Sequence, residues 1–262
     1  MCMIAILPAG VALSKEQVLD IMLFADDGLG VMYCGSHGLV VGRKMLRNPM
    51  RVWQWLSSLP IEVERFIHFR RTTRGDTHRD NLHPFVFHNV RFGLMHNGTL
   101  PDSLVPFDLP DGISDTSYFV RRYLHRMPVA ALTSTPFWDL VGAAAEDDRI
   151  VCLDGKTGVS YFTNRWGWYT GKHGIVISNN YAFKDEALWG VKKRKPVNVN
   201  WRSPLGERTL LDYSNEITKG AEKLTGQPTL DGVNHESSKT VVVAEPRQAS
   251  NKKGDEASPE QR

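Results

Sequence analysis

The sequence predicts an α+β domain built from two largely antiparallel β-sheets. Short apolar runs rich in β-branched and aromatic residues occur early in the chain and again between residues 149 and 178, and such runs are typical of strands. A block of segments with apolar residues at helical spacing lies between them. Because strands and helices do not alternate one by one, a parallel sheet of βαβ units is not expected. The 262 residues are enough to bury a large core.

The first half of the chain is predicted to begin with a strand. Met3–Leu7 is a short apolar run followed by Pro and Gly, which indicates a strand buried on both faces. Ser14 and Gln17 form a capping-box pair at the start of a helix. Gly35-Ser36-His37-Gly38 has the composition of a hairpin turn, and Asn48-Pro49 starts a second helix. The strands expected in this half lie at residues 3–7, 30–34, 39–42, 65–69 and 91–95.

The second half is predicted to contain helices followed by a strand block. Ser114-Asp115-Thr116 starts a helix, and a further helical face is formed by Phe137, Leu140, Val141 and Ala144. Tight turns then separate short apolar runs. The strands expected in this block lie at residues 150–153, 159–162, 166–169 and 175–177.

The apolar periodicity stops after about Tyr213. We therefore predict one domain over residues 1–213 and a disordered polar tail over residues 214–262, which cannot bury enough apolar surface to offset its ordering entropy. Lys192-Lys193-Arg194-Lys195 is interpreted as a solvated loop, with contact to an acidic partner or nucleic acid as the alternative.

Composition excludes several classes of protein. A net charge of +3 does not indicate a nucleic-acid or membrane partner. Three cysteines without a CxxC pair argue against a disulfide framework and a zinc site, and the histidines lack metal-ligand spacing. The sequence has no signal-peptide pattern and no apolar stretch near the ~18 residues of a membrane span. We expect a cytoplasmic protein without bound metal or cofactor.

Cys2 is the candidate nucleophile. A small side chain at position 2 permits removal of Met1 by an aminopeptidase, which places a free α-amine on the residue that carries the thiol. An α-amine titrates near pH ~8 and a thiol near ~8.5, so the two groups can exchange a proton close to neutral pH. The alternative is that Cys2 is only the second residue of a buried strand. Cys34 and Cys152 are interpreted as small buried hydrophobic residues.

Three further positions are candidates for substrate contacts. Arg70 follows a predicted strand and faces a polar loop, where it can bind a carboxylate or form a surface ion pair. The amide of Asn97 and the N–H of Gly98 can donate to an oxyanion, although Asn-Gly is also a common turn. Asp115 can hold an ammonium group or act as a helix-start acid. Asn81 and His83-Pro84-Phe85 are interpreted as structural.

In their order along the chain, these motifs resemble the class II glutamine amidotransferases, the N-terminal-nucleophile glutaminase family. The second of the five motifs corresponds to the family pattern His-x-Arg-x-Ala-Thr-His-Gly. Asp27-Gly28-Leu29-Gly30 and the strand block from Arg149 to Asn180 also look like the compact, stand-alone members. The resemblance covers roughly residues 2–185. Its motifs are Met1-Cys2-Met3-Ile4, His68-Phe69-Arg70-Arg71-Thr72-Thr73-Arg74-Gly75, Asn81-Leu82-His83-Pro84-Phe85, His96-Asn97-Gly98 and Ser114-Asp115-Thr116.

The resemblance implies a four-layer αββα sandwich and a thioester mechanism. Cys2 would attack the side-chain amide of L-glutamine with its own α-amine as proton acceptor, and Asn97 and the N–H of Gly98 would form the oxyanion hole. Ammonia would leave for a separate acceptor synthase, and water would release glutamate. No second catalytic domain is expected after Tyr213.

The resemblance also implies the substrate contacts. Arg70 would bind the α-carboxylate of glutamine, Asp115 its α-ammonium, and Thr73 would line the pocket. Arg71 and Arg74 depart from the family pattern, which often has an aromatic residue and a histidine there. These two cations motivate an alternative, a cysteine-dependent amidohydrolase acting on another amide. A second alternative is a catalytically silent domain that binds an acidic partner.

Overall fold

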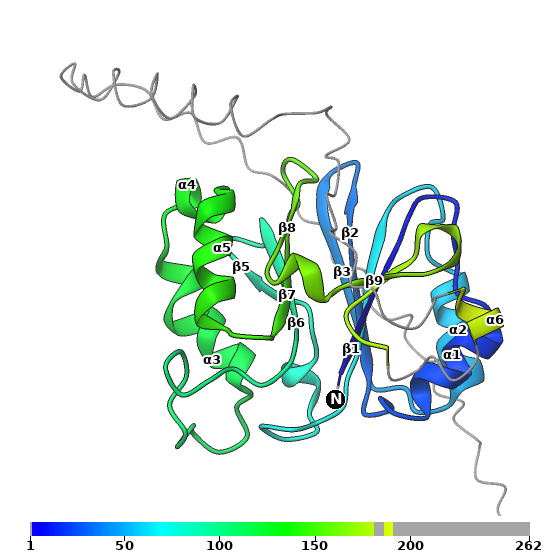
Figure 1. Ribbon diagram of the computed structural model, residues 1–262, viewed down its shortest axis with the longest axis horizontal. Helices are drawn as coiled ribbons and strands as arrows, with labels where there is room; N and C mark the ends of the chain where they lie inside the picture. Colours follow the sequence, from blue (N-terminus) through cyan, green and yellow to red (C-terminus); the bar gives the residue numbers. More distant parts are fainter. Residues whose placement is uncertain (1, 181–185, 191–262) are drawn as a thin grey trace, which may run out of the picture.

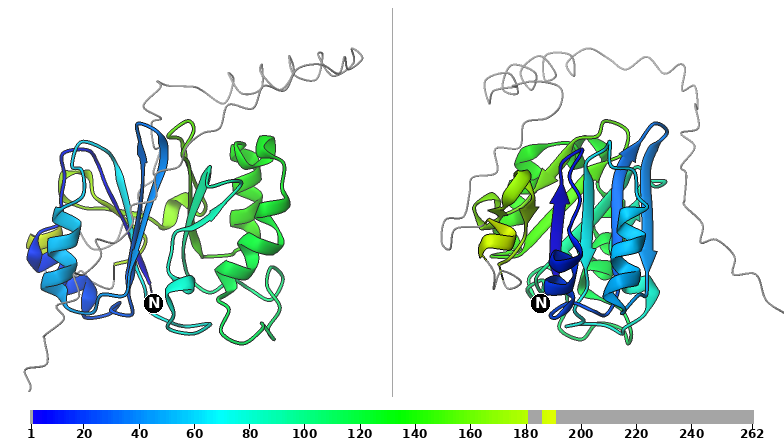
Figure 2. Two further views of the ribbon diagram at one scale, coloured as in Figure 1. Left: turned by 180° about the vertical axis from the view of Figure 1, so that it is seen from behind. Right: turned by 90° about the vertical axis from the view of Figure 1, so that its right-hand side faces the viewer.

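A computed structural model of the chain describes residues 2–180 and 186–190. Two antiparallel sheets pack face to face, and helices cover the outer face of each, giving four layers in the order α, β, β, α (Figure 1). Figure 2 shows the same layers from behind and from one side. The predicted α+β class with two antiparallel sheets is confirmed.

The first sheet has the strand order β3-β2-β4-β1-β10-β9, and helices α1, α2 and α6 cover it. Its strands are β1 (Met3–Leu7), β2 (Leu29–Gly35), β3 (Gly38–Lys44), β4 (Arg65–Phe69), β9 (Tyr169–Thr170) and β10 (Val176–Ile177). Its helices are α1 (Lys15–Met22), α2 (Pro49–Ser57) and α6 (Glu186–Trp189).

The second sheet has the order β5-β6-β7-β8, and helices α3, α4 and α5 cover it. Its strands are β5 (Phe85–Phe87), β6 (Phe92–Asn97), β7 (Arg149–Asp154) and β8 (Ser160–Phe162). Its helices are α3 (Asp115–Arg122), α4 (Val129–Leu132) and α5 (Thr135–Ala144). Short 3-10 helices lie at Arg79–Asn81, Leu124–Arg126, Arg165–Gly167 and Lys172–Gly174.

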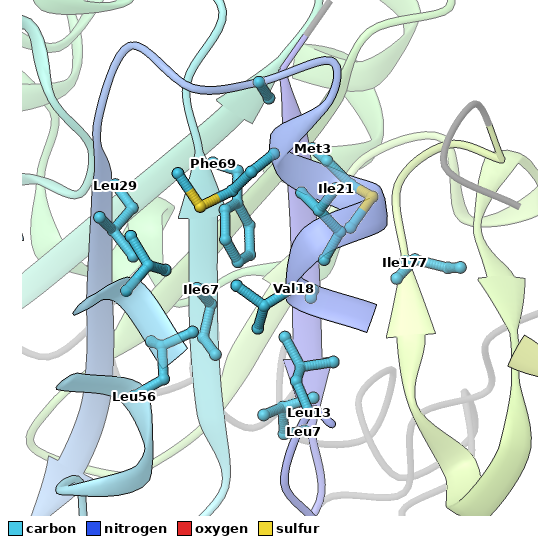
Figure 3. Close-up of a cluster of buried hydrophobic side chains, with 14 of the residues drawn as sticks. Met3, Leu7, Leu13, Val18, Ile21, Leu29, Leu56, Ile67, Phe69 and Ile177 are labelled. Carbon is cyan, nitrogen blue, oxygen red and sulfur yellow. The ribbon is translucent and has the colours of Figure 1, made fainter. Parts of the chain in front are cut away.

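Strand β1 is buried on both faces, as its continuous apolar sequence predicted. Met3, Ala5 and Leu7 pack against the helices of the first outer layer (Figure 3), whereas Ile4 and Ile6 pack against the second sheet. This alternation follows from the two-residue period of a strand. Because β1 pairs with β4 on one side and β10 on the other, its first residue is fixed between two strand ends.

In the first half of the chain, the predicted helix starts and the predicted hairpin turn are confirmed. Ser14 Oγ accepts from the Gln17 N–H at 3.2 Å, and Gln17 Oε1 accepts from the Ser14 N–H at 2.9 Å, which is the predicted capping box. Asn48 Oδ1 caps α2 by accepting from the Arg51 N–H at 3.1 Å. The β2–β3 hairpin pairs Gly35 with Gly38 across a two-residue turn.

Some predictions for the second half are wrong. Residues 165–167 form a 3-10 helix where a strand was expected at residues 166–169, and β5 was not foreseen because three residues give no readable period. Leu140 is 71% exposed, because Trp138 and Val141 form the buried face of α5. Cys34 is only half-buried, whereas Cys152 is fully buried. The tail at residues 214–262 and the Lys192–Lys195 run lie outside the described residues.

Candidate active site

The candidate residues lie at one end of the sandwich, where strands of both sheets start or stop. Cys2 precedes β1, and the pairing of Met3 with Phe69 places Cys2 beside the end of β4, which Arg70 follows. Asn97 is the last residue of β6, and Asp115 is the first residue of α3. In Figure 1 the N-terminal end of β1 lies at the lower edge of the molecule, between the two sheets.

The Cys2 thiol is enclosed by backbone groups. Its Sγ lies 3.2 Å from the Arg71 carbonyl oxygen and 3.3 Å from the Arg71 amide nitrogen. Burial raises the pKa of the Cys2 thiol, while the Arg71 N–H and the Arg70 guanidinium act in the opposite direction and Asp115 adds to the increase. The thiol therefore needs a nearby base to become a thiolate. Asn179 Nδ2 donates to the Cys2 carbonyl oxygen at 2.5 Å and fixes its backbone.

Arg70 is a buried cation with backbone partners. It is 3% exposed, and its guanidinium donates to the carbonyl oxygens of Asp76 at 3.0 Å and Arg74 at 3.4 Å. Burial lowers the pKa of Arg70, and the acidic groups of Cys2, Asp27, Asp115 and Asp76 oppose this effect. Within residues 2–180 and 186–190, no carboxylate lies at ion-pair distance from the guanidinium. Such a charge is available to a ligand carboxylate.

The cations that depart from the family pattern have acidic partners. Arg71 Nη1 lies 3.5 Å from Asp26 Oδ1. Arg74 Nη2 lies 3.4 Å from Asp102 Oδ1, and its guanidinium lies over the Phe107 ring at 5.7 Å. The Arg71 pair is exposed to solvent, and Arg74 Nη1 is buried without a hydrogen-bond partner among the described residues, so neither charge is fully compensated.

Thr73 lies in the same loop, after β4, and is exposed. The loop is attached to its surroundings on both sides of Thr73. The Thr72 N–H donates to Asp27 Oδ2 at 2.8 Å, and Asn81 Nδ2 donates to the carbonyl oxygens of Asp76 at 3.0 Å and Gly112 at 2.6 Å. Asn81 therefore joins this loop to the segment before α3. These contacts agree with a structural role for Asn81, and the role of Thr73 stays a prediction.

Asn97 connects the two sheets. It is fully buried, and its Nδ2 donates to Ser178 Oγ at 2.9 Å. The Oδ1 atom of Asn97 is buried and has no hydrogen-bond partner among the described residues. Ser178 Oγ also accepts from the Ile4 N–H at 2.8 Å, so one hydroxyl holds both the nucleophile strand and the Asn97 amide.

The backbone conformation and the surroundings of Gly98 leave no room for a side chain at this position. Its φ is +152°, and a Cβ at this position would lie 1.7 Å from Asp148 Oδ1. Asp148 Oδ1 accepts from the Thr99 N–H at 3.2 Å. The carboxylate of Asp148 is thus packed against the Asn97-Gly98 turn, whose role as an oxyanion site stays a prediction.

Asp115 is buried, and both of its carboxylate oxygens accept hydrogen bonds. Its Oδ1 accepts from the Thr116 N–H at 2.6 Å, and its Oδ2 accepts from the Leu100 N–H at 2.9 Å. The helix N-cap is Ser114, whose Oγ accepts from the Ser117 N–H at 3.2 Å. Asp115 therefore occupies the first turn, where a carboxylate is stabilised by the helix dipole.

Two stacked histidines lie next to the site. The rings of His68 and His83 are 4.0 Å apart, and His68 Nε2 lies 3.0 Å from the His96 carbonyl oxygen, to which it donates. Burial lowers the pKa of His68 to about 3 and lowers the pKa of His83 well below its usual range. Both rings are therefore neutral at physiological pH. The burial and stacking of His83 agree with a structural role, which stays a prediction.

Sequence reasoning missed several residues of the site. Ser178 and Asn179 follow the short strand β10, and they reach Cys2 and Asn97 only because β10 pairs with β1, which brings Ser178 to Ile4 across 174 residues of chain. Asp148 precedes β7, and no local motif marks it. Such residues are recognisable only from strand pairing between distant segments.

Neither a metal cluster nor a membrane helix is present in the described part of the chain. No group of three or more His, Cys, Asp and Glu side chains there is arranged to hold a metal ion. No helix among these residues is long and apolar enough to cross a membrane.

Comparison with known proteins finds similarity to solved structures. No protein-family model and no curated protein sequence matches the chain. The glutamine phosphoribosylpyrophosphate amidotransferase from B. subtilis, complexed with ADP and GMP, is similar with a TM-score of 0.46 and 13% identity over 73% of this chain and 44% of that one. A structure described as the allosteric regulatory enzyme of purine biosynthesis has a TM-score of 0.46 and 14% identity over 75% of this chain and 45% of that one.

A glutamine aminotransferase class-II domain protein from Silicibacter pomeroyi is also similar. Its TM-score is 0.33 and its identity 14%, over 68% of this chain and 87% of that one. The chain spans less than half the length of the first two structures.

Proposed function

We propose that this protein is a glutaminase of the class II glutamine amidotransferase type. It releases ammonia from L-glutamine through a thioester on Cys2 and passes the ammonia to a separate acceptor enzyme. The observation that carries the proposal is the enclosed Cys2 thiol beside Arg70, a buried cation that no carboxylate among the described residues neutralises. The five ordered sequence motifs and the four-layer fold support the same assignment.

Substrate binding follows from the charges at the site. Free glutamine carries one carboxylate and one ammonium group on its α-carbon, so its recognition needs one fixed cation and one fixed anion. Arg70 supplies the cation and Asp115 the anion, and both act electrostatically on the Cys2 thiol. Because both groups are buried, they are already ordered, and their contacts to the substrate lose little conformational entropy. In this proposal Thr73 lines the pocket from the loop.

In the proposed chemical step, Cys2 supplies both the nucleophilic thiol and the α-amine that acts as base. After removal of Met1, the Cys2 α-amine accepts the thiol proton and Sγ attacks the amide carbon of the substrate. The amide oxygen becomes an oxyanion, which the Gly98 N–H and the Asn97 amide stabilise by about 3 kcal/mol each. The C–N bond breaks, and the departing ammonia takes the proton from the α-ammonium group. Water then attacks the thioester, with the α-amine as base, and releases glutamate and the thiol.

The Asn97 amide needs one rotation to fill this role. In the present orientation the buried Oδ1 has no hydrogen-bond partner among the described residues. Exchanging Oδ1 and Nδ2 by rotating the amide lets the Ser178 hydroxyl donate to Oδ1, while Ser178 Oγ still accepts from the Ile4 N–H. The exchange gives the Ser178 hydrogen an acceptor and turns Nδ2 toward the substrate.

The direct test measures glutamate release and the mass of the mature protein. The wild-type protein should lack Met1, release glutamate from glutamine, and be labelled at Cys2 by a diazo-norleucine electrophile. Cys2→Ala should abolish release and labelling, and Cys34→Ala, a change at a half-buried thiol away from the candidate residues, should retain both. Undiminished release by Cys2→Ala refutes the proposal. Retention of Met1 without turnover favours a silent binding domain.

Arg71 and Arg74 each have an aspartate partner, but Arg74 Nη1 has none among the described residues, so these two residues do not decide between glutamine and a larger anionic amide. The three cysteines are free, which is compatible with a reducing compartment, and we propose a cytoplasmic location. The acceptor enzyme should be sought by pull-down with the full chain.

A further inference from the structure

We propose that Thr116, His96 and Asp148 are positioning residues that couple the ammonium-binding carboxylate of Asp115 to the oxyanion turn at Gly98. This inference rests on the proposed function. It assigns a further specificity to the site: hydrolysis is fastest for amides that carry an α-ammonium group. The coupling acts through hydrogen bonds between side chains that sequence analysis did not connect.

A continuous series of hydrogen bonds joins the Asp115 carboxylate to the turn at Gly98. The Thr116 hydroxyl lies 3.2 Å from Asp115 Oδ1 and 2.8 Å from His96 Nδ1. On the other side of the ring, His96 Nε2 lies 3.0 Å from Asp148 Oδ2. Asp148 Oδ1 then accepts from the Thr99 N–H at 3.2 Å, directly after Gly98. Every link is within hydrogen-bond distance.

The Thr116–His96 part of this series is shielded from water, and the partly exposed Asp148 is held through its backbone. Thr116 is 1% exposed and His96 is 2% exposed, so their hydrogen bonds act in a low-dielectric setting, where they are stronger. The backbone of Asp148 is fixed by Thr163 Oγ1 and Asn164 Nδ2, which donate to its carbonyl oxygen at 3.2 and 2.6 Å. A change at the His96 end therefore reaches the Asp148 carboxylate and cannot be absorbed by its backbone.

When the His96 ring carries one hydrogen, this series of hydrogen bonds has two possible arrangements. The Thr116 hydroxyl has one hydrogen, which it donates either to Asp115 or to His96 Nδ1. If it donates to Asp115, a neutral His96 must use its own hydrogen at Nδ1, and a lone pair on Nε2 then faces the Asp148 carboxylate. If it donates to His96, the ring hydrogen lies on Nε2 and is donated to Asp148. A neutral imidazole thus holds Asp148 only in the second state.

A substrate ammonium favours the second state. It supplies N–H donors to Asp115 and competes there with the Thr116 hydroxyl, which then turns to His96. The His96 ring hydrogen moves to the Nε2 side, and Asp148 gains a donor while it holds Thr99 and packs against Gly98. Ammonium binding therefore orders the turn that supplies the oxyanion donor. The gain is one hydrogen bond, which corresponds to roughly a tenfold rate effect.

The test compares two variants on two substrates. Thr116→Val removes the hydroxyl and keeps the shape, whereas Thr116→Ser keeps the hydroxyl. The substrates are glutamine and glutaramate, which is the same amide without the α-amino group. We expect Thr116→Val to lower kcat for glutamine about tenfold, Thr116→Ser to stay within about threefold of wild type, and both to change glutaramate hydrolysis by less than about threefold. Equal losses on both substrates, or equal losses in the two variants, overturn the coupling.

A spectroscopic measurement keeps the inference open to refutation if Thr116→Val unfolds. In Cys2→Ala protein with 15N-labelled histidine, glutamine should move the His96 hydrogen to Nε2, and glutaramate should not. An unchanged His96 tautomer with bound glutamine overturns the inference. Wild-type protein without Cys2-dependent glutamate release instead refutes the proposed function itself, so the two failures are distinguishable.

Discussion

Asn97 Nδ2 and Ser178 Oγ form a 2.9 Å hydrogen bond between the two sheets, at the end of the sandwich where Cys2 lies. The same Ser178 oxygen accepts from the backbone of Ile4, two residues after the nucleophile. One hydroxyl therefore sets the distance between the candidate nucleophile and the candidate oxyanion donor.

Ser178→Ala should reduce kcat for glutamine by one to two orders of magnitude, because the Asn97 amide loses the group that orients it. Loss of an acceptor for the buried Ile4 N–H should also lower the free energy of unfolding by about 1–3 kcal/mol. Steady-state kinetics and urea unfolding measure the two effects. Ser36→Ala, in the exposed β2–β3 turn, is the matched control and should change neither. Wild-type kcat in Ser178→Ala contradicts this prediction.

Gly98→Ala should abolish turnover and destabilise the protein. Its Cβ would lie 1.7 Å from Asp148 Oδ1 on a backbone with φ +152°, so the turn must move. Gly10→Ala is the control, because Gly10 also has positive φ, +81°, but a Cβ there would meet nothing within 4 Å. Gly10→Ala should cost only the backbone strain of about 1–2 kcal/mol and keep activity. Thermal unfolding and glutamate release are measured for both variants. Equal losses of stability and activity in Gly98→Ala and Gly10→Ala would argue against a specific role of the Gly98 turn.

Arg70→Lys should raise KM for glutamine about 10- to 100-fold with a smaller effect on kcat. Lysine keeps the charge but cannot make the bidentate contact to a carboxylate, and hydrogen bonds between charged groups are worth about 1.5–3 kcal/mol. Arg71→Lys changes a neighbouring, exposed arginine whose partner is Asp26, and it should leave KM within about twofold. If both variants behave alike, the carboxylate is bound elsewhere.

Stability should fall as the pH falls from about 6.5 to about 3. An unfolded histidine takes up a proton near pH ~6.5, whereas burial lowers the folded pKa of His68 to about 3. Below pH ~6.5 the unfolded state binds more protons, so the free energy of unfolding decreases by about 1.4 kcal/mol per pH unit for each such histidine. The pKa of His83 is shifted in the same direction and adds to the slope.

His68→Gln should flatten this pH dependence. Glutamine still has an N–H to donate to the His96 carbonyl oxygen, which His68 Nε2 contacts at 3.0 Å, but it does not titrate. Urea unfolding at pH 7 and pH 5 measures the slope, with His37→Gln in the exposed hairpin turn as control. An unchanged slope in His68→Gln would show that the acid sensitivity originates at other groups.

The parts of the fold that sequence could predict are those fixed by local physics. The uniformly apolar β1, the capping box of Ser14 and Gln17, and the Asn48 cap depend on contacts a few residues apart, and all were found. Strand β5 has three residues, too few for a period. The aromatic residues Trp166, Trp168 and Tyr169 favoured a strand by composition, but residues 165–167 form a 3-10 turn.

The candidate site also contains residues that the sequence could predict and residues that it could not. Cys2, Arg70, Asn97, Gly98 and Asp115 were selected from motifs, and the strand pairing gathers them at one end of the sandwich. Some of the residues that hold them in place lie outside the five motifs, and others stand in a motif but were given no role there. They are Ser178, Asn179, Asp148 and the side chains of His96 and Thr116, and their roles depend on pairing between segments more than a hundred residues apart or on side-chain contacts between elements.

The anchoring of Cys2 has a practical consequence for anyone who produces this protein. Its carbonyl oxygen is held by Asn179, its sulfur by Arg71, and the strand it opens is paired on both sides. An affinity tag fused ahead of Cys2 would leave a correctly folded protein whose amine is consumed in a peptide bond. If the Cys2 amine is the base, as proposed, purification handles belong at the carboxyl end, and a leader sequence that a protease removes directly before Cys2 would start glutamine hydrolysis on demand.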